Sequence, residues 1–152
     1  MRRLVASFFG TGLLLRRLAG VDRGSGTVAA AFALAISLLL ETNGQLAALA
    51  ISVGLSLWST SGLGDDESPG DHDPPWVVID EAAGTFLATV GLGGPPALVG
   101  WVVFRLADIA KRVFPGVAAA ERLPGSLGVT ADDLVAGLYG LAAGWAIQFV
   151  TQ

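Results

Sequence analysis

Five apolar stretches constrain the fold of this chain more than any other feature. They cover residues 26–40, 46–64, 82–94, 97–111 and 134–150. The segment ETNGQ between the first two carries helix-ending residues, so these two stretches are predicted to form a helical hairpin. Pro95 and Pro96 are expected to end the third stretch, since proline cannot continue a helix. Several stretches are shorter than the roughly 20 apolar residues of a plain membrane span, so tilted, kinked or partly embedded helices are expected.

The low content of charged residues sets the environment of these helices. Only 14% of the residues are charged and the mean hydropathy is +0.64, whereas about a quarter of an ordinary soluble domain is charged. The 21 glycines suit helices that pack closely through small faces. We therefore predict one domain over residues 1–152, an all-α, compact helical membrane bundle. It has about five membrane-embedded or spanning helices and a short N-terminal interfacial helix within residues 1–17.

The charged residues that remain are distributed unevenly. If the arginine-rich N-terminus is cytoplasmic, as the positive-inside rule favours, five crossings place nearly every charge on that face: residues 2–23, 65–81, 105–122 and 132–133. Only Glu41 falls on the opposite face. This segregation suits a membrane enzyme whose site faces lipid headgroups at the cytoplasmic interface. No basic patch suggests a nucleic-acid partner.

The stretch DHDPPWVVIDEAAG, residues 71–84, is the first candidate for chemistry. Asp80 and Glu81 follow an apolar run and precede a helix, where ionised groups are costly unless they are paired, hydrated or bound to a cation. The plainer interpretation makes Asp80 a helix N-cap and Glu81 a first-turn acid on the favourable end of the helix dipole. Asp73 can reach the same locality around the Pro74–Pro75 turn. His72 alone is weak evidence, since a single loop histidine is more often solvated than catalytic.

The second candidate is FRLADIAK, in which Arg105, Asp108 and Lys111 recur at i, i+3 and i+6. On one helix these residues lie within an arc of about 120° and share a face. Arg105 and Asp108 at this spacing can simply neutralise each other as a helix ion pair. A face with a guanidinium and an ammonium group also suits a phosphate ligand. The pattern alone leaves both interpretations open.

The third candidate is GSLGVTADDLVAG, residues 125–137. Thr130 is predicted to be the N-cap of a helix, with the Asp133 side chain reaching back to the Thr130 amide in a capping-box-like arrangement. Capping explains the presence of Asp133 but not that of Asp132. Asp132 and Asp133, together with Asp80, Glu81 and Asp108, supply enough hard oxygen ligands for Mg²⁺. The glycine-rich start of this stretch, GSLG, leaves backbone amides available to bind an anion.

Taken together, the three segments resemble the phosphatidylglycerophosphatase A family. The matching pieces are FGTG and GSGT near the start, HDPPWVVIDEAAG, FRLADIAK and GSLGVTADDLVAG, in the family's order. The resemblance implies a Mg²⁺-dependent phosphatase of the bacterial inner membrane, with its site facing the cytoplasm, that converts phosphatidylglycerophosphate to phosphatidylglycerol. The resemblance leaves open whether the protein forms a homo-oligomer. The residues on the polar positions of the family's motifs are Asp73, Asp80, Glu81, Arg105, Asp108, Lys111, Asp132 and Asp133.

Elimination supports a mechanism built from carboxylates and metal. The chain has no cysteine for a phosphocysteine, a single histidine, and no DxDxT signature. We expect Mg²⁺ to be held by acids drawn from Asp80, Glu81, Asp132 and Asp133, while Arg105 and Lys111 neutralise charge on the phosphoryl group. Asp73 or Asp108 is the expected base toward a metal-bound water, and direct attack by a carboxylate is the alternative.

A protein of another class remains as the competing hypothesis. A non-catalytic membrane protein, either an assembly subunit or a small cation transporter, also uses intramembrane acids. A transporter places such acids near the bilayer midplane, whereas the acids of this chain are predicted at helix ends.

Overall fold

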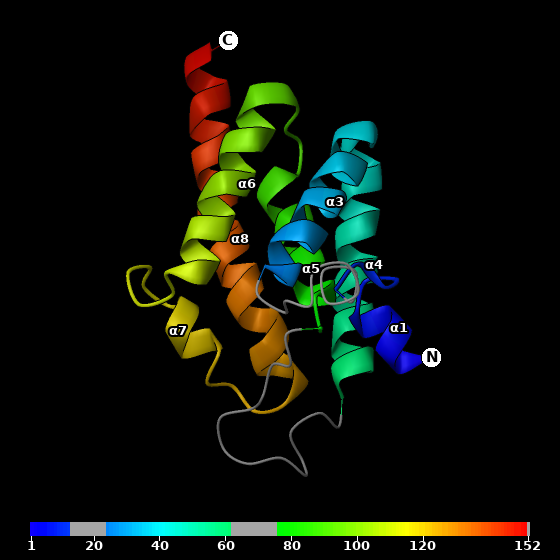
Figure 1. Cartoon of the computed structure of the whole chain (residues 1–152). Coiled ribbons are helices and arrows are strands. Elements are labelled where there is room, and N and C mark those ends of the chain that lie inside the picture. The colour runs from blue at the N-terminus through cyan, green and yellow to red at the C-terminus, as the bar shows by residue number, and fades with distance from the viewer. Residues whose placement is uncertain (13–23, 62–75, 152) are drawn as a thin grey trace.

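The computed structural model describes residues 1–12, 24–61 and 76–151, and within these ranges every regular element is a helix. This confirms the predicted all-α class. The helices, shown in Figure 1, are α1 (Arg2–Ala6), α3 (Ser25–Leu39), α4 (Thr42–Thr60), α5 (Ile79–Thr89), α6 (Gly94–Ile109), α7 (Val117–Ala120) and α8 (Ser126–Thr151).

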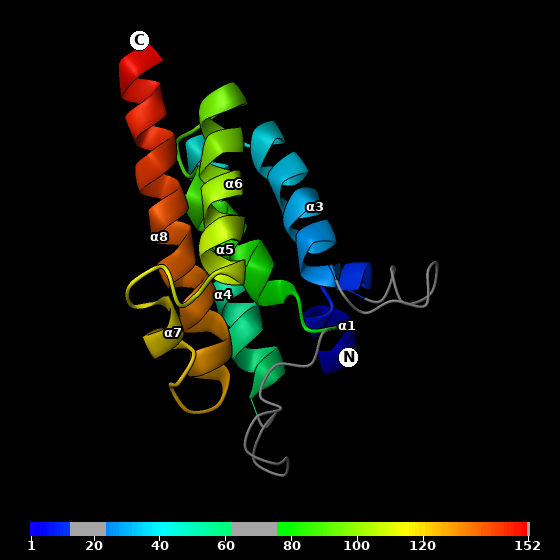
Figure 2. The same ribbon diagram turned by 60° about the vertical axis from the view of Figure 1, so that its left-hand side comes forward.

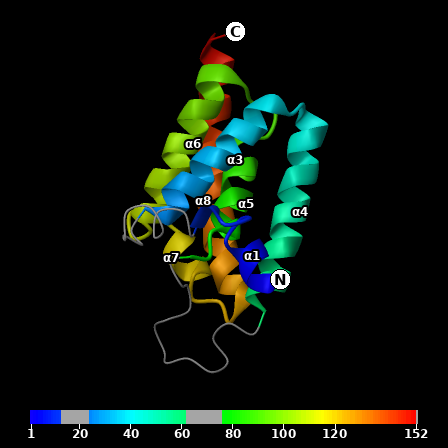
Figure 3. The ribbon, with the colours of Figure 1, turned by 45° about the vertical axis from the view of Figure 1, so that its right-hand side comes forward.

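The long helices alternate in direction along one bundle axis. Helices α3 and α4 form the predicted hairpin, which is joined at the end of the bundle far from the N-terminus (Figure 3). Helix α8 lies along α6 (Figure 2), and α5 is central because it packs against α3, α4, α6 and α8. Nine of its eleven residues are buried. The helix that carries Asp80 and Glu81 is therefore the inner helix of the bundle.

The proline pair begins a helix and does not end one. Helix α5 ends at Thr89, ahead of the predicted stop, and α6 begins at Gly94 with Pro95 and Pro96 in its first turn. Proline is tolerated there because the first amide groups of a helix have no partner within it. The turn between the helices needs glycine, since Gly91 has a φ of +71°.

Two further predictions of helix boundaries are wrong. Helix α8 begins at Ser126, so Thr130 lies inside it and does not cap it; the Thr130 hydroxyl forms a 2.7 Å hydrogen bond with the Ser56 hydroxyl of α4. Helix α6 ends at Ile109, so Lys111 does not share a helix face with Arg105. Lys111 lies in the turn toward α7, where acids from two other segments contact its ammonium group.

Close contact between α5, α6 and α8 depends on glycine. A Cβ atom on Gly100 would lie 2.6 Å from the carbonyl oxygen of Ala88, and one on Gly137 would lie 2.8 Å from that of Gly84. Both obstacles are backbone atoms, which cannot move aside as a side chain can. On α8 one stripe repeats at helical spacing and faces α5 and α6: Asp133, Gly137, Gly140 and Gly144. The glycines thus bring Asp133 close to α5.

The bundle has an apolar exterior and a partly polar interior. All the buried residues of α4 are polar, namely Gln45, Ser52, Ser56, Ser59 and Thr60, while Leu46, Ile51 and Trp58 are exposed. Small and hydroxyl-bearing residues inside and large apolar residues outside are typical of helices packed within lipid. One helix among the described residues, α8, is long and apolar enough to span a membrane, and only 22% of its apolar window is buried. The prediction of about five spans stays a prediction.

The N-terminal segment is helical for only part of the predicted length. Helix α1 packs against α4, and Arg2 and Arg3 lie over the rings of Trp58 and Trp76, at 5.6 and 5.0 Å from the ring centroids. Of the remaining predicted segment, residues 13–17 lie outside the described ranges.

Candidate functional site

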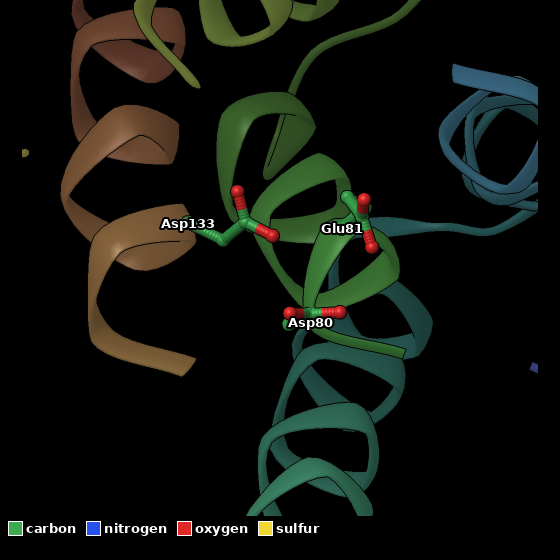
Figure 4. A group of neighbouring side chains, drawn as sticks. All are labelled: Asp80, Glu81 and Asp133. Carbon is green, nitrogen blue, oxygen red and sulfur yellow. The ribbon is translucent and has the colours of Figure 1, made fainter. Parts of the chain in front are cut away.

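Three carboxylates from two helices converge at the lower end of α5. Asp80 and Glu81 come from the first turn of α5 and Asp133 from the second turn of α8, and one oxygen of each lies within 4.8 Å of the others. Figure 4 shows Asp133 reaching from α8 toward the two α5 side chains. We call these three residues the acidic cluster. Asp80 is 2% exposed and Asp133 is 3% exposed, so both carboxylates are shielded from bulk water.

The start of α5 is held by backbone contacts. Val78 is the N-cap, without a side-chain capping bond, and its amide donates to the carbonyl oxygen of Ala6 at 2.8 Å. The interpretation of Asp80 as the N-cap is therefore wrong. Asp80 and Glu81 lie inside the first turn, where the positive end of the helix dipole favours negative charge.

Asp133 has an oxygen without a donor among the described residues. Its Oδ1 atom is buried and accepts no hydrogen bond from them. An unsatisfied carboxylate oxygen in a low-dielectric interior is costly. A bound cation would remove this cost, because it replaces the missing donors with a charge.

Arg105 and Asp108 form an ion pair beside the acidic cluster. Arg105 Nη1 lies 2.7 Å from Asp108 Oδ2, and the two side chains are 11% and 14% exposed. Arg105 Nη2 also donates to the Thr27 hydroxyl at 3.3 Å. The ion pair that the spacing allowed is therefore present, and the hydrogen bond to Thr27 directs Nη2 toward the first turn of α3.

Gly26 is the point at which Glu81 and Arg105 meet. A Cβ atom on Gly26 would overlap Glu81 Oε1 and would lie 3.3 Å from Arg105 Nη2. The carboxylate and the guanidinium group therefore both approach the α3 backbone where only glycine leaves room. Sequence reasoning missed Gly26 and Thr27 as site residues, and the only signal for them was the run GSGT at the start of a helix.

Lys111 is held between two acids. Its Nζ atom contacts Asp132 Oδ2 at 2.5 Å and Glu121 Oε1 at 2.9 Å. Burial lowers the pKa of Lys111, but the charge of Asp132 and the hydrogen bonds that Lys111 donates to both acids raise it by more, so the net pKa lies above its usual value. Lys111 therefore stays cationic at physiological pH.

Asp132 differs from its neighbour Asp133. Its Oδ1 atom accepts a 3.0 Å hydrogen bond from the Asp133 amide, and its Oδ2 atom contacts Lys111. Both oxygens are therefore engaged within the protein, and Asp132 is not part of the acidic cluster. Its predicted role as a metal ligand stays a prediction.

The structure brings together seven of the eight residues predicted for the site. Three form the acidic cluster, Arg105 approaches Glu81 at Gly26, and the charge of Asp108 acts on Lys111, Asp132 and Asp133. The eighth, Asp73, lies outside the described residues, as does His72. The arrangement of clustered carboxylate oxygens beside a guanidinium and an ammonium group can bind a divalent cation and a phosphate at the same time.

Comparisons with known proteins agree with this chemistry. The family model described as phosphatidylglycerophosphatase A matches residues 4–148. A curated protein of Bacteroides thetaiotaomicron, whose name gives it the provisional role of a phosphatidylinositol-3-phosphatase, is 31% identical over 117 residues. The match covers 74% of this chain and 69% of the relative. No solved structure matches the chain.

Proposed function

Since the chain belongs to the phosphatidylglycerophosphatase A family and is a lipid phosphatase, we propose that its substrate is phosphatidylglycerophosphate. The reaction removes the terminal phosphomonoester and leaves phosphatidylglycerol, a step of phospholipid biosynthesis. The acidic cluster, with Arg105 and Lys111 close by, is the observation that carries this proposal.

We further propose that Mg²⁺ is the cofactor and that Asp80, Glu81 and Asp133 hold it. The donor set fits this ion, because all three groups are hard oxygen ligands and Asp133 Oδ1 lacks a donor among the described residues. When bound, Mg²⁺ supplies a Lewis acid that polarises the phosphoryl oxygens. Asp132 then acts as a positioning residue. It contacts Lys111 and accepts a hydrogen bond from the Asp133 amide, and these two contacts hold the turn of α8 that carries Asp133.

The cationic side chains have separate roles in this proposal. Arg105 offers a planar fork for the phosphoryl oxygens, and its ion pair with Asp108 sets the direction of that fork. Lys111 contributes a fixed positive charge because its two acids hold it in place. Asp108 and Asp73 stay the proposed bases, and attack by a carboxylate stays the alternative to attack by water.

The surface of the bundle supports a site at a membrane interface. The first turn of α5, the last turn of α6 and the start of α8, which carry the site, lie toward one end of the bundle, whereas the turn between α3 and α4, which contains Glu41, lies at the other end (Figure 1). Large apolar side chains are exposed along α3, α4, α6 and α8 between these ends. We propose that this apolar surface lies in the bacterial inner membrane and that the site faces the cytoplasm, in accordance with the positive-inside rule.

Phosphate release from the purified protein in detergent tests the proposal. We expect release from phosphatidylglycerophosphate with Mg²⁺ and none with a chelator, and restoration when Mg²⁺ is added back. Phosphatidylinositol 3-phosphate is the second substrate to compare, because of the relative's name. The matched control is Glu41→Gln, which removes a carboxylate at the other end of the bundle and is expected to retain full activity.

The same assay separates the enzyme from the non-catalytic alternative. The family match and the position of the acids at helix ends favour the enzyme over an assembly subunit or a cation transporter. Folded wild-type protein that releases no phosphate from either lipid contradicts the proposed function.

A further inference from the structure

A second polar feature lies beside the acidic cluster, in the turns that follow α6. A cavity of about 440 Å³ is lined by Ile109, Lys111, Arg112, Val113, Glu121 and Arg122. Its size falls in the range of pockets that bind small ligands or headgroups. The proposed mechanism assigns a role to only one of these residues, Lys111.

The lining of this cavity is cationic. It contains three basic side chains and one acid, and Glu121 is already paired with Lys111. Arg112 and Arg122 form no ion pair with any described residue, and both are exposed. Two guanidinium groups are therefore available to a ligand, and guanidinium groups bind phosphate oxygens with two parallel hydrogen bonds.

Lys111 connects the cavity with the acidic cluster. It lines the cavity, and its ammonium group contacts Asp132, which directly precedes Asp133 of the cluster. The Lys111–Asp132 contact therefore joins the cavity lining to the turn of α8 that also carries Asp133.

An apolar stripe on α6 leads to the same cavity. Leu98, Val102, Leu106 and Ile109 recur at helical spacing and are 51%, 42%, 55% and 71% exposed. Ile109 belongs both to the stripe and to the cavity lining. Acyl chains that lie along the stripe would place the attached headgroup at Arg112 and Arg122.

We propose that this cavity binds the phosphodiester of a phospholipid substrate, which is the phosphate that the reaction does not remove. The inference rests on the proposed function, because it takes the acidic cluster as the place of the phosphomonoester. Arg112 and Arg122 bind the diester oxygens, and the headgroup then extends past Lys111 toward Asp133. The site thereby selects lipids that carry a diester and a monoester in one headgroup.

A binding titration without Mg²⁺ tests the cavity apart from catalysis. The probe is dihexanoyl phosphatidylglycerol, which has a diester and no monoester, and dihexanoyl phosphatidylcholine is the neutral reference. Binding to the detergent-solubilised full chain is measured by calorimetry. We expect the Arg112→Gln/Arg122→Gln variant to bind phosphatidylglycerol about tenfold or more weakly than wild type, because two charge-assisted contacts are lost.

The control variant is Arg2→Gln/Arg3→Gln. It removes the same charge from α1, which lies on the opposite side of the bundle from α7 (Figures 1 and 2). We expect it to bind as wild type does. Equal weakening in both variants, or no weakening in the Arg112 and Arg122 variant, overturns the proposal. Competition by millimolar inorganic phosphate as effective as that by the lipid assigns the cavity to free phosphate and also overturns it.

Kinetics provide a second measurement. For phosphatidylglycerophosphate we expect the Arg112→Gln/Arg122→Gln variant to raise KM about tenfold with kcat largely retained, since the diester is bound equally in the ground and transition states. A loss confined to kcat contradicts the proposal. If wild type releases no phosphate, the proposed function fails while the titration still decides whether the cavity binds a diester.

Discussion

Polar groups are buried at both ends of the bundle, but their hydrogen-bond partners differ between the two ends. At the end far from the acidic cluster, Gln45, Ser37 and Thr89 form a group that we call the neutral cluster. Gln45 Nε2 donates to the carbonyl oxygens of Ser37 and Leu92, its Oε1 atom accepts from the Gly91 amide at 2.7 Å, and the Ser37 and Thr89 hydroxyls lie 2.7 Å apart. The acidic cluster instead gathers carboxylates, and Asp133 Oδ1 has no donor among the described residues.

The difference indicates which cluster stabilises the fold and which serves chemistry. The neutral cluster joins α3, α4 and the end of α5 with complementary donors and acceptors, so it holds the helices without a ligand. The acidic cluster brings like charges together, which costs free energy until a cation binds. Groups that are costly in the protein alone are typical of functional sites. The following predictions test this contrast.

The largest effect is expected for Asp80→Asn in the acidic cluster. We expect phosphate release to fall on the order of 10²–10³-fold, because a carboxylate that holds the cation is lost. We expect Mg²⁺ to raise the unfolding temperature of wild type and to leave that of the variant unchanged. A variant that keeps both the activity and this rise would remove Asp80 from the metal site.

A smaller loss is expected for Gly26→Ala. The added methyl group overlaps Glu81 Oε1, so the carboxylate must turn away from Arg105. Such a displacement costs activity on the order of 10–100-fold, with little loss of stability because the obstacle is the end of a side chain. The control is Gly54→Ala on α4, where a Cβ atom meets nothing within 4 Å. Equal activity of the two variants contradicts the placement of Glu81.

The neutral cluster is expected to respond in stability and not in chemistry. Gln45→Ala removes the acceptor of the Gly91 amide and one donor to each of the Ser37 and Leu92 carbonyl oxygens, which costs about 1–3 kcal/mol in the free energy of unfolding. Turnover per folded molecule should stay at the wild-type value. Unfolding in a denaturing-detergent titration measures the first quantity, with the exposed neighbour Leu46→Ala as the control. A fall in turnover for the folded variant would erase the contrast between the clusters.

The smallest effect concerns Lys111 and pH. Its folded pKa is raised above 10.5, so its contribution to stability is complete below the unfolded pKa and is lost only as the pH rises through the folded value. The stability difference between wild type and Lys111→Gln should therefore be the same at about pH 7 and pH 9.5. A difference that shrinks over this range would show that the contacts with Asp132 and Glu121 do not hold the charge.

Most helices could be predicted, but several of their ends could not. The first two apolar stretches lie at α3 and α4 within a few residues, because polar turn residues mark their limits. Pro95 and Pro96 misled the prediction, since a proline can either follow the end of a helix or occupy the first turn of one, and here the pair lies in the first turn of α6. Thr130 has the sequence context of a cap, yet a hydrogen bond to Ser56 from a distant helix accounts for it. Such a contact has no local signal in the sequence.

The amino-acid sequence by itself determined the helical class and the residue types at the site, because apolar runs and isolated charges are local properties. Only the tertiary structure decided which charges meet. Asp132 and Asp133 are adjacent in the chain, yet one contacts Lys111 and the other faces Asp80 and Glu81, because successive side chains on a helix point in different directions. How closely Asp133 approaches α5 depends on glycines of α5, α6 and α8 that lie far apart in the sequence.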